Sequence, residues 1–477
     1  MDDERQGTST ACAGCRERDA RLAESERKLT ELERKLAESA RRLAELERKL
    51  AEVSRESQRQ TAKFPRRKLI PPSEHKPSGR KPGHDGAFRT IPKQVDRTIV
   101  VPCQTCPKCR VTLVDPRTRD LYQTDIPPVT PVVTKFEVHG GTCPCCGKYR
   151  QGRHEEQITD PTPVVQSVLG PRVLGMAADW KHRLGIVYRK VTELFDTCFS
   201  LKVSPGTLNR AEIRFAQRAL PTYDWLLEAL RKAGVVHADE TGWRISRRNA
   251  WLWVFASKDI TIYAIRFRRG HEVPADMLGD DFSGVLIVDG LSSYDVRECV
   301  KGRCVAHILR RARGLTENDS LPKPDRDHVE ELITLLKRAL DTAARREEWA
   351  ASTFDRKRSQ IERAFDQWVT SAAKDRRHAD VKRLAKHLRH HRHEWFLFLY
   401  DPDIPATNNH AERQIRPAVI LRKLGSCHRE FLHAIPHEIT ASLTTTCRQR
   451  GHPFLELAKQ IWLTRRPRAF PDRKSVV

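Results

Sequence analysis

The stretch "VVHADETGWR", Val235–Arg244, places two adjacent acids at the end of a short apolar run. A run of this length, bounded by polar residues, is typical of a β-strand. Successive side chains of a strand point to opposite faces of its sheet, so Asp239 and Glu240 should face opposite ways. Asp239 would then stand at the carboxyl end of the strand, and the two acids should not serve one site together.

Three further segments have strand-like patterns. They are "NAWLWVFAS" (249–257), "ITIYAIRF" (260–267) and "GVLIVDG" (284–290). The last is apolar up to Asp289, as expected of a strand buried on both faces with helices above and below. A helix over "YDVRECVKG" (294–302) and a short strand in "RCVAH" (303–307) should follow. This order is typical of an RNase H-like α/β domain, which we assign to residues 232–426.

Three acids are candidates for one catalytic site. Asp239 and Asp289 each end a strand, and the strand spacing would bring their carboxylates within about 5–7 Å if the strands are parallel neighbours. Glu412 lies in the first turn of a helix in "ATNNHAERQIRP" (406–417). Clustered carboxylates repel, and a divalent cation resolves that repulsion. Alternatively, Asn409 and Glu412 form a capping box, and the two aspartates are ordinary turn residues.

Cysteines indicate a zinc site. The chain has 13 cysteines, and six of them fall within residues 103–146. Two Cys-x-x-Cys pairs have the spacing of zinc knuckles, and they are Cys106/Cys109 and Cys143/Cys146. Cys103 or Cys145 could replace one of these ligands. Four thiolates leave no open coordination position, so zinc should stabilise a ribbon-like segment, residues 103–150, and take no part in catalysis.

The N-terminal part has two sections of contrasting composition. Leucines recur every seven residues from Leu22 to Leu50, which predicts a coiled coil over residues 16–57 and therefore a homo-oligomer. The alternative is a single solvated helix. Residues 58–102 are rich in proline, glycine and basic side chains, which predicts an extended linker. Arg80 and Lys81 of this linker either contact DNA phosphates or belong to a plain tether.

Residues 158–230 have helical patterns. "YRKVTELFDTCF" (188–199) and "SPGTLNRAEIRFAQRAL" (204–220) are separated by a short turn, with Ser204 as a good N-cap before a proline. The pair resembles a helix-turn-helix that would present Arg210 and Arg214 to DNA. An ordinary helical hairpin is the alternative. A second helical region, residues 427–468, should form a C-terminal tail.

The overall charge favours a polyanionic partner. Lys and Arg number 87 against 62 for Asp and Glu, giving a formal net charge of +25. Nucleic acid is the usual partner of so basic a chain. No apolar stretch is long enough to cross a membrane, and the N-terminus is not signal-like. We therefore expect a cytoplasmic, multidomain α+β protein that binds DNA and not membranes.

Four motifs resemble those of the insertion-sequence-66 family of transposases. They are "HADETGWR" (237–244), "DDFSGVLIVDGLSSYD" (280–295), "CVAHILRR" (304–311) and "NNHAERQIRP" (408–417). The family's order of zipper, basic linker, zinc segment and DDE domain matches residues 16–465. The resemblance implies a DDE transposase with catalytic acids at Asp239, Asp289 and Glu412 that bind Mg²⁺ or Mn²⁺. It also implies a helical insertion at about 316–400, transposon ends and target DNA as partners, and accessory proteins of the same element.

Several neighbours of the acids could support them. Asn408 and Asn409 would contact phosphate or orient Glu412, unless they only cap the helix. His307, in the family's Cys-x-x-His element with Cys304, would touch the scissile region unless it is structural.

Other side chains of the domain could contact DNA directly. Arg413 and Arg416 would contact phosphates unless they are merely solvated, and Trp243 would stack on a flipped base unless it belongs to the core. Two rival functions stay open: an RNase H-like nuclease or resolvase without strand transfer, and a non-enzymatic, zinc-containing DNA-binding regulator.

Overall fold

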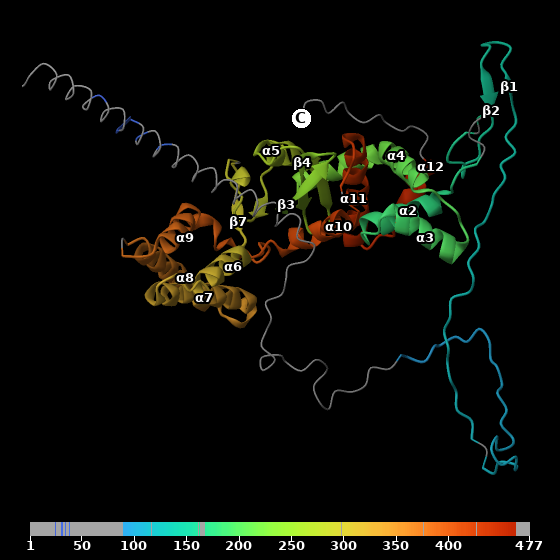
Figure 1. The fold of residues 1–477 in the computed structure, drawn as a ribbon, viewed down its shortest axis with the longest axis horizontal. Coiled ribbons are helices and arrows are strands. Elements are labelled where there is room, and N and C mark those ends of the chain that lie inside the picture. The colour runs from blue at the N-terminus through green and yellow to red at the C-terminus, as the bar shows by residue number, and fades with distance from the viewer. Residues whose placement is uncertain are drawn as a thin grey trace, which may run out of the picture. The chain divides into compact units, whose positions relative to one another are not determined.

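The computed structural model describes residues 89–463 except 116, 161, 163–166, 297, 375 and 426 (Figure 1). The chain divides into two units, Met1–Thr90 and Ile91–Val477. Of the predicted coiled coil at 16–57, only residues 24, 30, 31, 34 and 38 are described, and these five are helical. Arg80 and Lys81 lie outside the described residues. Among the helices that are described, none combines the length and apolar character that a membrane span requires.

A five-stranded mixed sheet forms the centre of the second unit, in the order β5-β4-β3-β6-β7. The strands β3 (Val235–Ile245), β4 (Arg248–Ala256) and β5 (Thr261–Arg266) are antiparallel neighbours. The strands β6 (Val285–Val288) and β7 (Lys301–Arg303) continue the sheet in parallel. Three antiparallel strands followed by a buried parallel strand confirm the expected order.

The strand β3 is longer than predicted. It pairs with β6 only at residues 235–237 but continues beside β4 to Ile245. The expectation that Asp239 ends its strand is therefore wrong, because a long hairpin with β4 carries the strand past it. What ends near Asp239 is the parallel pairing with β6.

The prediction of a helix at 294–302 is also wrong. The chain forms only a short 3₁₀ turn, η2 (Ser292–Tyr294), before β7. Tyr294 is fully buried and packs edge-on against Trp253, with ring centroids 5.9 Å apart. Its hydroxyl donates a hydrogen bond to Glu240 at 2.8 Å. These tertiary contacts override the local helical pattern, and a helix starts only at Val305.

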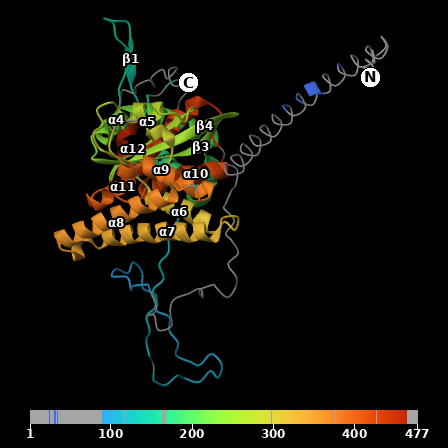
Figure 2. The same ribbon diagram turned by 90° about the vertical axis from the view of Figure 1, so that its left-hand side faces the viewer.

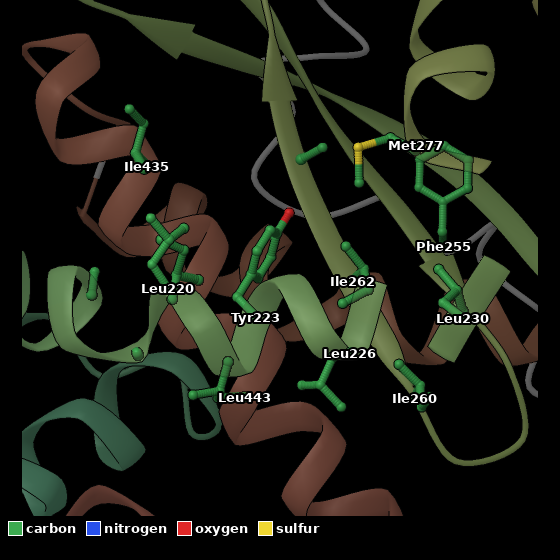
Figure 3. Close-up of a cluster of buried hydrophobic side chains, with 14 of the residues drawn as sticks. Leu220, Tyr223, Leu226, Leu230, Phe255, Ile260, Ile262, Met277, Ile435 and Leu443 are labelled. Atoms are coloured by element: carbon green, nitrogen blue, oxygen red, sulfur yellow. The ribbon is translucent and has the colours of Figure 1, made fainter. Parts of the chain in front are cut away.

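One face of the sheet packs against α4 (Pro205–Arg231) and α5 (Glu272–Leu278). Ser204 caps α4 as predicted, by accepting a hydrogen bond from the Thr207 amide. Figure 3 shows Tyr223, Leu226 and Leu230 of α4 in the cluster with sheet residues Phe255 and Ile262. This cluster, the largest of the described core, fixes the sheet beneath the helical region.

The opposite face carries α10 (Asn409–Gly425). Ala411, Ile415 and Ala418 of this helix pack with Trp243 and Leu252 of the sheet. In Figure 2, α4 and α5 lie on one side of β3 and β4, and α10 lies on the other. The sheet is thus sandwiched between helices, as the apolar run in β6 predicts.

The free edge of β5 is closed by α11 (Ala434–Gln449), which lies along it. Three α11 side chains accept hydrogen bonds from β5 amides: Glu438 from Ile265 at 2.9 Å, Ser442 from Tyr263 at 2.9 Å, and Thr446 from Thr261 at 3.1 Å. Four helical residues rise about 6 Å and two strand residues about 6.6 Å, so the spacings match. The region predicted as a tail, 427–468, therefore contains a helix that is built into the sheet.

Three more helices complete this layer. They are α2 (Pro171–His182), α3 (Tyr188–Phe199) and α12 (Phe454–Leu463). The helix α12 packs against α2 and α4, and α3 packs against both α2 and α4. The predicted helical region at 158–230 is consequently joined to the sheet through α4.

A second core lies in the helical insertion, which Figure 1 shows as a separate group of helices. Its elements are α6 (Val305–Thr316), α7 (Lys323–Ala344), η3 (Arg346–Glu348), α8 (Ala351–Ala372), α9 (Ala379–His390), η4 (Arg392–Glu394) and η5 (Leu397–Leu399). The buried face of α6 belongs to this core, so the insertion's packing begins before the predicted residue 316. The segment η4 contacts β7 and thereby joins the two cores.

Candidate active site

The sheet register brings Asp239 and Asp289 together. Val235 lies opposite Val285, and His237 lies opposite Ile287. The parallel pairing ends there, two residues before Asp239 and Asp289, and Asp289 lies close enough for its charge to raise the pKa of Asp239. Neighbouring strands are about 4.8 Å apart. Both side chains are half-buried at the point where β6 ends.

Asn408 ties the start of α10 to the residues just before Asp239. Its Nδ2 donates to the Ala238 carbonyl at 2.7 Å, and its Oδ1 accepts from His237 Nδ1 at 3.0 Å. Its carbonyl accepts from the Glu412 amide at 3.2 Å. Asn408 is 0 % exposed, so the interpretation that it contacts phosphate is wrong, and the interpretation that it orients Glu412 fits its contacts.

The three predicted catalytic acids share one electrostatic environment. Burial raises the pKa of Asp239 from 3.8 to about 7, and the carboxylates of Glu240, Asp289 and Glu412 add to that rise. The Glu240 amide, which donates to Asp239 Oδ1 at 2.9 Å, opposes it. Mutual repulsion of this kind is what a bound divalent cation removes.

Glu240 faces away from α10, as strand alternation predicts. Its carboxylate accepts from Arg269 at 2.6 Å and from the Tyr294 hydroxyl at 2.8 Å, on the α4 side of the sheet. Its pKa is raised by burial and by Asp289. The Glu240 carboxylate is therefore already bound by Arg269 and Tyr294, and this side chain affects the candidate site through its charge.

His307 lies beside the acids on α6. Its Nε2 is 3.9 Å from Glu412 Oε1. The Cys304 thiol raises the pKa of His307, burial opposes the rise, and Asp289 contributes to it. Cys304 is itself buried and accepts a hydrogen bond from the Asn408 amide at 3.1 Å. The Cys-x-x-His element thus contacts Asn408 through Cys304 and lies beside Glu412 through His307.

The other predicted supporting residues lie on the surface of α10. Asn409 is its first residue and is exposed, and Arg413 and Arg416 are also exposed. Because the helix starts at Asn409, the residue in the capping position is Asn408, whose side chain is used by β3. Glu412 is thus not held by the capping box that we considered from the sequence.

Trp243 belongs to the core. It is 3 % exposed, and its indole N–H donates to His428 Nδ1 at 3.1 Å. The interpretation that Trp243 stacks on a flipped base is therefore wrong, because β3 turns this side chain toward α10 and α11 and leaves it no surface.

The three acids are suitable ligands for Mg²⁺, but their carboxylates do not converge on one position in the structure. Hard divalent cations prefer carboxylate oxygens, which all three residues offer. Within the described part of the chain, however, no three His, Cys, Asp or Glu side chains converge closely enough to hold a metal. The donor set therefore fits the cation by ligand type and by charge.

In each predicted zinc knuckle, the backbone amides after the first cysteine hydrogen-bond its sulfur, as expected of a Cys-x-x-Cys turn that supplies two of four zinc ligands. Backbone amides of the following residues lower the pKa of Cys106, and the same arrangement lowers the pKa of Cys143. The second pair lies in the turn between β1 (Gly140–Thr142) and β2 (Tyr149–Gln151). The partners Cys109 and Cys146 are exposed, and in the described residues the two pairs do not form one four-thiolate group.

The helical region places its predicted DNA contacts on the surface. Arg210 and Arg214 are exposed and lie one turn apart on α4. The preceding helix α3 ends at a left-handed Ser200, which turns the chain toward Ser204. Sequence reasoning missed Arg303, a buried cation at the end of β7. The sequence feature that could have revealed it is an arginine within "RCVAH" (303–307), the segment predicted to form a short strand.

Comparison with known families gives one match. Residues 166–430 match a family model described as "Transposase IS66 family". The matched range exceeds half of the chain and includes the three acids, His307 and the whole helical insertion. A comparison with curated proteins finds no match.

Proposed function

The chain belongs to the IS66 family of transposases, and from this we propose that it binds the ends of an insertion sequence and catalyses metal-dependent strand cleavage and strand transfer. The observation that carries the proposal is geometric: β3 and β6 run in parallel up to the residues before Asp239 and Asp289, and Asn408 bonds the start of the Glu412 helix to the Ala238 carbonyl. These acids come from two strands and a helix distant in sequence. The strand order β5-β4-β3-β6-β7 supports an RNase H-like assignment of this domain.

We assign the three carboxylates as ligands of Mg²⁺ or Mn²⁺. When bound, such ions activate the attacking oxygen and stabilise the leaving oxygen of a phosphoryl transfer. The protein's part is to hold the carboxylates: β3 and β6 fix the two aspartates by register, and Asn408 anchors the helix that carries Glu412. His307, next to Glu412, is suitably placed to hydrogen-bond a phosphate oxygen.

DNA would approach along exposed arginines. Arg413 and Arg416 follow Glu412 on α10, and Arg210 and Arg214 line α4. Each phosphate contact releases counterions, which makes binding salt-dependent. The net charge of +25 supports a polyanionic partner, and Arg80 and Lys81 of the linker would add contacts.

The zinc, oligomer and partner assignments are further parts of the proposal. We assign a structural zinc to Cys106, Cys109, Cys143 and Cys146, which is supported by the lowered pKa of the first cysteine of each pair. The heptads at 16–57 support a homo-oligomer. Small accessory proteins of the same element complete the proposed set of partners.

The deciding experiment uses the full chain with labelled DNA from either side of its reading frame. Wild type should cut this DNA in Mg²⁺ or Mn²⁺ and join precut ends to a target plasmid. The variants Asp289→Asn and Glu412→Gln should bind DNA normally but lose cleavage by at least about 10³-fold. The exposed Asp281→Asn is the matched control and should keep full activity.

Other outcomes of this experiment would favour one of the two rival functions or change the assignment of the site. Cleavage without joining of precut ends would favour a nuclease or resolvase. Binding with no metal-dependent cleavage by wild type would favour a regulator. Cleavage by Asp289→Asn at the wild-type rate would remove that residue from the active site.

A further inference from the structure

Arg303 is a buried cation at the end of β7, directly beside the proposed active site. It is 2 % exposed, and its backbone pairs with Val288, the residue before Asp289. Burying a guanidinium costs free energy unless its N–H groups are hydrogen-bonded and its charge is paired. The positions of those acceptors therefore indicate what the residue does.

The guanidinium joins β7 to two other segments of the chain, the loop of residues 289–295 and η4. Its Nη1 donates to the backbone carbonyl of Asp289 at 3.0 Å. Its Nη2 donates to the carboxylate of Asp295, which lies in the loop after Asp289. Its Nε donates to Glu394 at 2.5 Å, and Glu394 belongs to η4 of the helical insertion. Only the planar fork of arginine can make three such bonds in fixed directions.

The insertion also lies near the loop that Arg303 holds. A Cβ built on Gly290 would lie 4.0 Å from His387 Cε1 of α9. Inside the loop, the Leu291 amide donates to Asp289 Oδ1 at 2.9 Å, which fixes the direction of the carboxylate. The orientation of Asp289 therefore depends on a loop that is clamped from β7 and from the insertion.

We propose that Arg303 is a positioning residue that couples the seating of the helical insertion to the placement of the Asp289 carboxylate. When η4 is seated, Glu394 holds the guanidinium fork, and the fork holds the Asp289 carbonyl and Asp295. When η4 moves away, Arg303 loses one of its two counterions and the loop loosens. The inference rests on the proposed function for its catalytic meaning, but the coupling itself is a property of the fold.

The test compares Arg303→Met and Arg303→Lys with a matched control. Arg377→Met is that control, because the partly buried Arg377 forms an ion pair with the buried Asp325 at 3.2 Å wholly within the insertion. Hydrogen–deuterium exchange of residues 289–296 reports the loop directly, without DNA or metal. Half-maximal Mn²⁺ concentration for cleavage and affinity for end DNA are the second and third measurements.

Arg303→Met should speed exchange at 289–296 and raise the Mn²⁺ requirement, each by about 10-fold or more, with DNA affinity within about twofold of wild type. Arg303→Lys should recover part of both effects. Glu394→Gln, which removes only the insertion's charge, should give smaller changes in the same direction. Its carboxylate is 23 % exposed, so this variant decides the matter if Arg303→Met fails to fold.

Two results would overturn the coupling. One is exchange at 289–296 in the Arg303 variants no faster than in Arg377→Met. The other is wild-type exchange in Glu394→Gln. Failure of the proposed function looks different, because wild type would then cut no DNA while the Arg303 variants still loosened the loop.

Discussion

Replacing Asp239 with Asn should abolish strand cleavage and yet stabilise the metal-free protein. The pKa of this carboxyl is raised from 3.8 to about 7, first by burial and then by the neighbouring carboxylates. Ionised Asp239 therefore destabilises the fold. The protonated form contributes stability below pH 3.8, and this contribution is lost as the pH rises through about 7.

The expected size follows from that shift. At about 1.36 kcal/mol per pKa unit, ionisation costs about 4 kcal/mol at pH 8 and about 2 kcal/mol at pH 5.5. Asn carries no charge, and its oxygen still accepts the Glu240 amide. Asp239→Asn should consequently raise the free energy of unfolding by up to these amounts, with the larger gain at pH 8.

Urea unfolding in EDTA, followed by tryptophan fluorescence at both pH values, measures the gain. Adding 10 mM Mg²⁺ should narrow the gap, because the cation stabilises the wild-type carboxylates. The exposed Asp281→Asn should show no such pH-dependent difference from wild type. The reasoning fails if Asp239→Asn is no more stable than wild type at pH 8, or if its gain is equal at both pH values.

Three further predictions concern stability and zinc. Glu212→Gln should cost about 3–5 kcal/mol in urea unfolding at neutral pH, because this buried carboxylate accepts from Lys181 at 2.5 Å, His182 at 2.7 Å and Tyr188 at 2.7 Å. Burial would raise the pKa of Glu212, but Lys181 and His182 hold it well below 4.5, so the cluster's stability is lost only as the pH falls into the acid range. Ser442→Ala should cost about 1–3 kcal/mol in the same assay by leaving the Tyr263 amide without its acceptor. Thr444→Ala should cost less, because the Thr444 hydroxyl bonds only carbonyls of its own helix. Metal analysis should find zinc in wild type and in Cys198→Ser but not in Cys143→Ser; equal zinc in all three would exclude Cys143 as a ligand.

The sequence located β6 and separated the faces of Asp239 and Glu240 because both features depend on short-range rules. A continuous apolar run located β6, and side-chain alternation separated Asp239 from Glu240. These inferences require only the pleat and the order of the strands. The length of β3 was not predictable in this way, because the strand continues beside β4 after its parallel pairing with β6 has ended.

Other features depend on contacts between distant residues, which local patterns do not contain. The 3₁₀ turn at Tyr294 exists because Trp253 and Glu240 bind that side chain. Arg303 is buried because Asp295 and Glu394 neutralise it from both sides. The sequence predicted that Asn408 contacts phosphate or orients Glu412, with helix capping as the alternative, and only the folded chain shows its side chain bonded to β3.

The closing of β5 by α11 has a consequence for protein synthesis. Ile265 is translated 173 residues before Glu438, its acceptor. Until α11 emerges from the ribosome, the nascent sheet exposes a bare edge that could pair with another chain. The sheet is thus complete only after a helix that follows β5 by more than 150 residues has been synthesised. Chains that end before α11 would keep this edge unpaired and should be prone to aggregate.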